Sequence, residues 1–161
     1  MKKVFIFLLA LTAAIGSFAR TNSGTEDASK KITAAQPITS LVINGDISVV
    51  LLNGTSKEIT IEGSAAAVKN FVVTQTNGAV TISDFSGQKR TVAIVYVPAR
   101  LINKISLNGA AAVSSYESLY NKNIDVVING DCKLWLKTYG SVTVDAINEF
   151  DYTYSTKAIQ E

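Results

Sequence analysis

Residues 126–136 read V-V-I-N-G-D-C-K-L-W-L, and the same frame occurs at residues 41–51 and 105–115. Those two copies read L-V-I-N-G-D-I-S-V-V-L and I-S-L-N-G-A-A-A-V-S-S. Each copy joins two short runs through an Asn-Gly corner. The copies that start at 105 and 126 are 21 residues apart, whereas those at 41 and 105 are 64 apart, or about three such steps. Repeats of about 20 to 30 residues made of short strands are typical of a β-solenoid, so the frame predicts an all-β fold of this kind.

The alternation of apolar residues within the frame assigns side chains to the two faces of each strand. Successive side chains of a strand point to opposite faces, so every second residue of the last copy should point inward. The corners of neighbouring copies should stack, which places Asn108 beside Asn129, and the glycine after each is expected to have a positive φ. The predicted inward row is Ile124, Val126, Ile128, Cys132, Leu134 and Leu136.

The half of the chain before residue 98 predicts hairpins and one short helical turn. Runs rich in Val, Ile and Thr follow one another between residues 38 and 97, each bounded by Gly, Asn, Asp or Ser. Asn77-Gly78 lies between two such runs and indicates a tight hairpin, because both residues tolerate positive φ. Ser64 precedes an alanine run and is expected to cap a helical turn that ends near Asn70.

The N-terminus has the pattern of a secretory signal peptide. Lys2 and Lys3 precede an apolar run at residues 4–15, and Ser17 and Ala19 are the small residues of a cleavage site. The sequence therefore predicts three parts: a signal peptide at 1–19, a flexible spacer at 20–35 and a hairpin-rich β-solenoid domain at 36–157. We expect an exported protein, in the periplasm, at the cell surface or outside the cell, with no transmembrane segment in the mature chain.

Charge argues against a nucleic-acid partner. Two of the 15 basic residues lie in the predicted signal peptide, so the mature chain has 15 − 2 = 13 basic residues against 13 acidic ones. A net charge near zero offers no basic patch of the kind that binds phosphates.

The residue types exclude most catalytic and metal-binding chemistry. The chain has no histidine and one cysteine, which removes histidine-based nucleophiles, thiolate clusters and most zinc sites. Glycoside hydrolysis needs two carboxylates about 5 to 10 Å apart, yet Asp131 aligns with Ala110 in the preceding copy and Asp125 aligns with Lys104. We therefore expect no enzymatic activity, no cofactor and no metal site. The alternative is a weak calcium site at a C-terminal acidic cluster of Asp145, Glu149 and Asp151.

The order of motifs resembles one known family. The motifs are I-x-x-L-V-I-N-G-D-I-S-V-V-L at Ile38, E-I-T-I-E-G at Glu58, G-A-V-T-I at Gly78 and Y-V-P-A-R-L-I-N-K-I-S-L-N-G at Tyr96. Over residues 36–155 this order is similar to that of the "putative auto-transporter adhesin, head GIN domain" family of secreted Bacteroidetes-type proteins. The resemblance implies a right-handed, single-stranded β-helix and an adhesin-like function, with no catalytic motif. The chain departs from the family in two ways. It has only two or three terminal repeats, and its corners carry Asn-Gly where the family more often has Ser-Gly.

Lys133, Trp135 and Lys137 are the candidate binding residues. If Leu134 and Leu136 point inward, the single tryptophan points outward between two lysines. An exposed aromatic side chain beside polar groups can stack on a sugar ring or anchor a protein contact. The alternative is that another strand or the N-terminal segment covers these residues. Four tyrosines would add aromatic surface or, for the last two, cap the open end of the repeat: Tyr116, Tyr120, Tyr152 and Tyr154.

These features favour a non-enzymatic, exported envelope protein that binds a glycan or a surface protein. Two alternatives from other classes stay open. An acidic cluster on one outer sheet would favour a polysaccharide-acting β-helix enzyme, and an uncovered terminal repeat would favour a structural envelope protein that associates with its own kind. The oligomeric state is not predicted by the sequence.

Overall fold

The computed structural model of the protein describes residues 27–85, 93–146 and 153–157 of the 161-residue chain. The predicted signal peptide at residues 1–19 lies outside these ranges. The described chain contains one short helix, α1 (Ala65–Lys69), and thirteen strands. In chain order the strands are β1 (Asp27–Thr33), β2 (Ser40–Asn44), β3 (Ser48–Leu52), β4 (Glu58–Ser64), β5 (Phe71–Thr76), β6 (Ala79–Asp84), β7 (Ala93–Pro98), β8 (Lys104–Asn108), β9 (Ala112–Ser115), β10 (Asn123–Asn129), β11 (Lys133–Lys137), β12 (Ser141–Ala146) and β13 (Thr153–Lys157).

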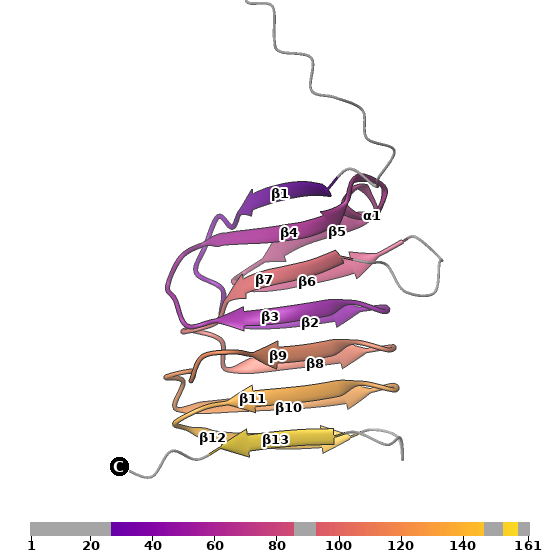
Figure 1. Ribbon diagram of the computed structural model, residues 1–161. Helices are drawn as coiled ribbons and strands as arrows, with labels where there is room; N and C mark the ends of the chain where they lie inside the picture. Colours follow the sequence, from indigo (N-terminus) through magenta and orange to yellow (C-terminus); the bar gives the residue numbers. More distant parts are fainter. Residues whose placement is uncertain (1–26, 86–92, 147–152, 158–161) are drawn as a thin grey trace, which may run out of the picture.

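The strands form two mixed sheets, one behind the other in Figure 1. The seven-stranded sheet has the order β1-β4-β7-β3-β9-β11-β13, and the six-stranded sheet has the order β12-β10-β8-β2-β6-β5. Neighbouring strands are parallel except in the pairs β1–β4, β4–β7 and β5–β6. The inward side chains of the two sheets form one hydrophobic cluster between them.

The predicted right-handed, single-stranded β-helix, or β-solenoid, is wrong. In such a fold consecutive turns stack in sequence order, but here β2 lies between β8 and β6, and β3 lies between β9 and β7. Leu41 of the first copy pairs with Ile105 of the second copy on one side and with Val80 on the other. The 64-residue step is therefore not three intervening turns, because the strands between the copies continue the sheets beyond β2 and β3. Antiparallel pairs at that end make both sheets mixed.

The Asn-Gly corners stack as the sequence predicts, and the first copy joins the stack. Asn129 pairs in register with Asn108, and Asn108 pairs with Asn44. The side-chain Nδ2 of Asn108 donates a hydrogen bond to Oδ1 of Asn44 over 2.8 Å. The glycines that follow have positive φ, as predicted for the last two: Gly45 (116°), Gly109 (99°) and Gly130 (140°).

Burial confirms the predicted faces. The inward row spans β10 of one sheet and β11 of the other, and all six of its residues are buried: Ile124, Val126, Ile128, Cys132, Leu134 and Leu136. The Sγ of Cys132 donates to the backbone oxygen of Gly109 over 3.3 Å. Burial raises the pKa of the Cys132 thiol, so this side chain acts as a small apolar filler rather than a reactive group.

The local turn signals are also confirmed. Asn77 (φ 49°) and Gly78 (φ 80°) join antiparallel β5 and β6. The Oγ of Ser64 accepts a hydrogen bond from the Ala67 N–H over 3.2 Å and caps α1. Within the described residues, no helix is long and apolar enough to cross a membrane.

The first strand differs from expectation. The sequence assigns residues 20–35 to a flexible spacer, but β1 occupies Asp27–Thr33 and pairs along its whole length with β4. Ala28 and Ile32 pack against the core from this strand. Lys31 Nζ lies 2.8 Å from a carboxylate oxygen of Glu58, and both side chains are exposed. The alternation of apolar and polar residues is weak in this segment, because only two apolar residues point inward. The segment is therefore a strand because it pairs with β4, and its local pattern does not predict this.

Candidate functional site

Trp135 lies at the centre of the outward face of β11. Its neighbours Leu134 and Leu136 are buried, whereas Lys133 and Lys137 are exposed on the side of the indole. Trp135 is 43% exposed, so no described strand covers it. The structure thus brings the three candidate residues together on one surface, as the alternation predicts, and their role in binding stays a prediction.

The indole belongs to a row of residues in register that crosses the seven-stranded sheet, and on its other side it pairs with Ser155 of β13. Trp135 is in register with Ser114 of β9, Ser114 with Val50 of β3, and Val50 with Tyr96 of β7. Three strand spacings separate the two aromatic residues, or about 14 Å at about 4.8 Å per strand. Short side chains lie between them, and Val50 is only 4% exposed although it points outward. We call this row, together with Lys133 and Lys137, the Trp135 face.

The two lysines of the Trp135 face have no carboxylate partner in the described part of the chain, where the single salt bridge joins Lys31 and Glu58. Lys137 Nζ donates to the backbone oxygen of Tyr116 over 3.1 Å, which holds its charge at the end of β11. Positive charge therefore flanks the indole on both sides along the strand, and neither lysine forms a salt bridge with another described side chain. Such an arrangement suits a ligand with anionic groups and a flat apolar face.

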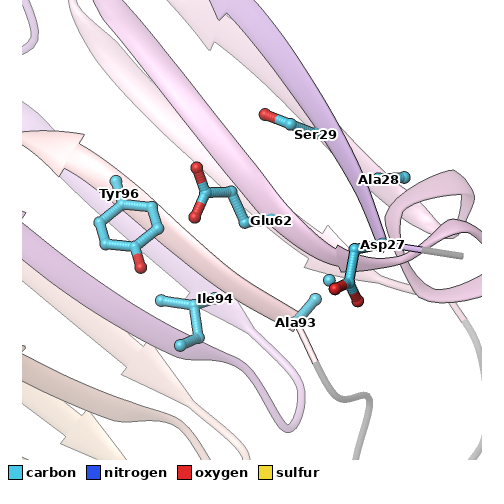
Figure 2. A pocket seen from close by; sticks show the side chains of 8 residues that line it. Asp27, Ala28, Ser29, Glu62, Ala93, Ile94 and Tyr96 are labelled. Atoms are coloured by element: carbon cyan, nitrogen blue, oxygen red, sulfur yellow. The ribbon is translucent and has the colours of Figure 1, made fainter. Parts of the chain in front are cut away.

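A pocket of about 410 Å³ opens on the same sheet, between β1, β4 and β7 (Figure 2). Two carboxylates line it, those of Asp27 and Glu62. Asp27 pairs with Ser64 and Ser29 pairs with Glu62. The two acidic residues are therefore diagonal neighbours, with Cα atoms about 7 to 8 Å apart. In Figure 2 the carboxylate of Glu62 points toward Tyr96, away from that of Asp27.

This pair of carboxylates is not predicted from the sequence, because Asp27 falls in the expected spacer at residues 20–35 and outside the repeated frame. The motif E-I-T-I-E-G does place Glu62 on the outward face of a strand. Asp27 comes close to Glu62 only through the pairing of β1 with β4, which at this end of the strands joins residues 33 to 37 positions apart (62 − 29 = 33 and 64 − 27 = 37) and which no local pattern specifies.

The alternative calcium site is incomplete in the described residues. Asp145 lies on β12, whereas Glu149 and Asp151 fall outside the described ranges. Across residues 27–85, 93–146 and 153–157, no three His, Cys, Asp or Glu side chains are grouped to hold a metal ion. Tyr152 also lies outside the described residues.

Comparison with known proteins gives a family and a fold. A family model described as "Putative auto-transporter adhesin, head GIN domain" matches residues 37–159. No curated protein matches the sequence.

Two putative adhesins are among the solved structures that are similar to the chain. A putative adhesin from Parabacteroides merdae ATCC 43184 is 14% identical with a TM-score of 0.63, and the match covers 80% of this chain and 56% of that one. A putative adhesin from Bacteroides fragilis NCTC 9343 is 18% identical with a TM-score of 0.51, and the match covers 75% of this chain and 62% of that one. The chain thus spans less than two thirds of either structure, and at these identities the likeness concerns the fold alone.

Proposed function

This chain belongs to the family "Putative auto-transporter adhesin, head GIN domain", and on that basis we propose that it is an exported protein that binds an acidic glycan at the cell surface without catalysing a reaction. The family membership confirms the resemblance seen in the motif order. The family description supports attachment as the general role. The ligand class comes from the chemistry of the Trp135 face.

The exposure of Trp135 between two lysines that form no salt bridge within the described ranges is the observation that carries the proposal. At 43% exposure the indole leaves a large part of its apolar surface in water, and its flat face is suited to the apolar face of a sugar ring. The flanking ammonium groups of Lys133 and Lys137 complement carboxylates on the same ligand. Tyr96, about 14 Å along the row, offers a second ring to an oligosaccharide that lies across the strands.

Replacing Trp135 by alanine is expected to weaken glycan binding by about 1 to 3 kcal/mol, because the indole is the anchor of the surface. The free energy of unfolding should change little, since the side chain is 43% exposed. A glycan array followed by calorimetric titration of the selected acidic oligosaccharide measures the first effect, and urea denaturation measures the second.

Val72→Ala is the matched control. Val72 is 45% exposed but lies on β5, at the far edge of the six-stranded sheet. It should leave glycan affinity unchanged. An equal loss of glycan affinity in both variants would contradict an acidic-glycan site at the Trp135 face. Binding of the protein to surface proteins, with no glycan bound on the array, would also contradict it.

A second candidate function, cleavage of a polysaccharide, is favoured by one observation. Asp27 and Glu62 line one pocket, and glycosidases use a pair of carboxylates that flank the scissile bond. In Figure 2 the carboxylate of Glu62 points toward Tyr96, away from that of Asp27, which does not suit joint action on one bond.

We therefore expect no release of reducing ends when the protein is incubated with acidic or neutral polysaccharides. A reducing-sugar assay with wild type and a Glu62→Gln variant measures this. Release of reducing ends by the wild type that Glu62→Gln abolishes would establish the enzyme instead of the binding protein.

A further inference from the structure

Exposed aromatic residues also gather where the chain crosses from the seven-stranded to the six-stranded sheet. Three neighbouring connections cross between the sheets in this way, at residues 99–103, 116–122 and 138–140. They lie on the left side of Figure 1. We call them the crossover edge. The rings of Tyr120 and Tyr139 stack there, with centroids 4.6 Å apart and planes inclined by 20°, and both are exposed. The guanidinium carbon of Arg100 lies 5.3 Å from the centroid of the Tyr120 ring.

Buried groups hold this stack in place. Asn121 is 5% exposed, and its Nδ2 donates to the backbone oxygens of Ala99, over 2.7 Å, and of Ile102. These bonds fix the turn that carries Arg100. The Tyr139 N–H donates to the backbone oxygen of Leu119 over 3.0 Å, which ties the turns of the two tyrosines together. The stack is therefore built on a backbone that is already ordered before any ligand arrives.

A hollow of about 290 Å³ adjoins the stack and shares Arg100 with it. Two cations, Arg100 and Lys122, and the amides of Asn103 and Asn123 line the hollow. Within the described ranges, neither cation forms a salt bridge. Glu117 is the single acidic residue in the three connections, and it does not line the hollow.

We propose that the crossover edge binds a carboxylate-bearing sugar, with its carboxylate at Arg100 and Lys122 and its ring against the Tyr120–Tyr139 stack. A guanidinium receives a carboxylate through two parallel hydrogen bonds, and an aromatic ring receives the apolar face of a pyranose. The amides offer donors and acceptors for sugar hydroxyls. This site is separate from the Trp135 face and does not depend on the proposed function there.

The test uses the Trp135→Ala protein, so that ligand held at the Trp135 face does not contribute. Calorimetric titration compares tri-galacturonate with its methyl ester. The acid should bind at least about tenfold more tightly than the ester, and Arg100→Gln should remove that difference, because charge-assisted hydrogen bonds are the stronger kind. Tyr139→Ala should weaken both ligands by about tenfold, whereas Tyr116→Ala, an exposed tyrosine outside the stack, should weaken neither.

A titration with monomeric galacturonate distinguishes a free sugar from a sugar unit within a polysaccharide. Affinity equal to that of the trimer indicates a single sugar, and weaker affinity indicates a unit of a polysaccharide. Arg100→Gln leaves a neutral, exposed side chain and is expected to fold, so it tests the proposal even if Tyr139→Ala does not fold. Equal affinity for acid and ester, no effect of Arg100→Gln, or tighter binding of a single-stranded oligonucleotide would overturn the proposal.

Discussion

A Gly130→Ala protein is expected to be less stable than the wild type by about 2 to 6 kcal/mol, which is enough to unfold a domain of ordinary stability. Gly130 has a φ of 140°, where a residue with a side chain is strained by about 1 to 3 kcal/mol. A β-carbon there would lie 2.8 Å from the backbone nitrogen of Gly109 and closer still to its oxygen. Relief of that contact must separate two stacked corners, at a further cost of about 1 to 3 kcal/mol. Urea denaturation followed by circular dichroism measures the loss.

Gly54→Ala is the matched control for this effect. Gly54 also follows an asparagine, but its φ is not in the positive range and no heavy atom lies within 4 Å of the position that its β-carbon would take. This substitution should change the free energy of unfolding by less than about 0.5 kcal/mol. Similar losses in the two variants would show that the corners at Gly130 and Gly109 are not stacked as described.

Leu134→Ala is expected to cost about 2 to 5 kcal/mol, because it removes a buried side chain and leaves a cavity. Leu134 is 1% exposed and belongs to the cluster between the two sheets. It points opposite to the Trp135 face, so a stability loss here carries no direct loss of binding contacts. Equilibrium unfolding in urea gives the size of the effect.

Lys133→Ala tests the face assignment beside it. Lys133 is exposed, and its replacement should change the free energy of unfolding by less than about 0.5 kcal/mol. Equal losses for Leu134→Ala and Lys133→Ala would mean that the register of β11 is shifted by one residue, which would turn Trp135 into the core.

Local pattern predicts the strands, corners and faces of this protein but not the order in which they stack. Alternation from Ile124 to Leu136 assigns the inward row correctly, because the period of two is a property of each strand alone. The corner at Asn77-Gly78 is likewise read from two residues. The insertion of β2 between β8 and β6 depends on pairings over 39 and 64 residues, and a repeat spacing cannot distinguish neighbouring copies from distant ones. That is why the predicted single-stranded β-helix is wrong.

The candidate sites also differ in how far local sequence pattern predicts them. The exposure of Trp135 follows from alternation within β11, so the sequence predicts it without knowledge of the neighbours. The partners that complete the Trp135 face, Ser114, Val50 and Tyr96, come from three other strands. The crossover edge is harder still to predict from the sequence, because Arg100, Tyr120 and Tyr139 belong to three separate connections. Aromatic residues in polar turns are the one signal that points to it.

Titration of the protein with the acidic oligosaccharide selected on the array, followed by the fluorescence of Trp135, tests the central claim most directly. Trp135 is the single tryptophan of the chain, so its emission reports on one site. Binding at the Trp135 face should shift the emission saturably to shorter wavelength as the sugar displaces water, and about 1 M salt should weaken it by screening the lysines. The Arg100→Gln protein is used for this titration, so that ligand held at the crossover edge does not contribute. Saturable binding of that protein detected by calorimetry with no change in Trp135 emission would contradict the account.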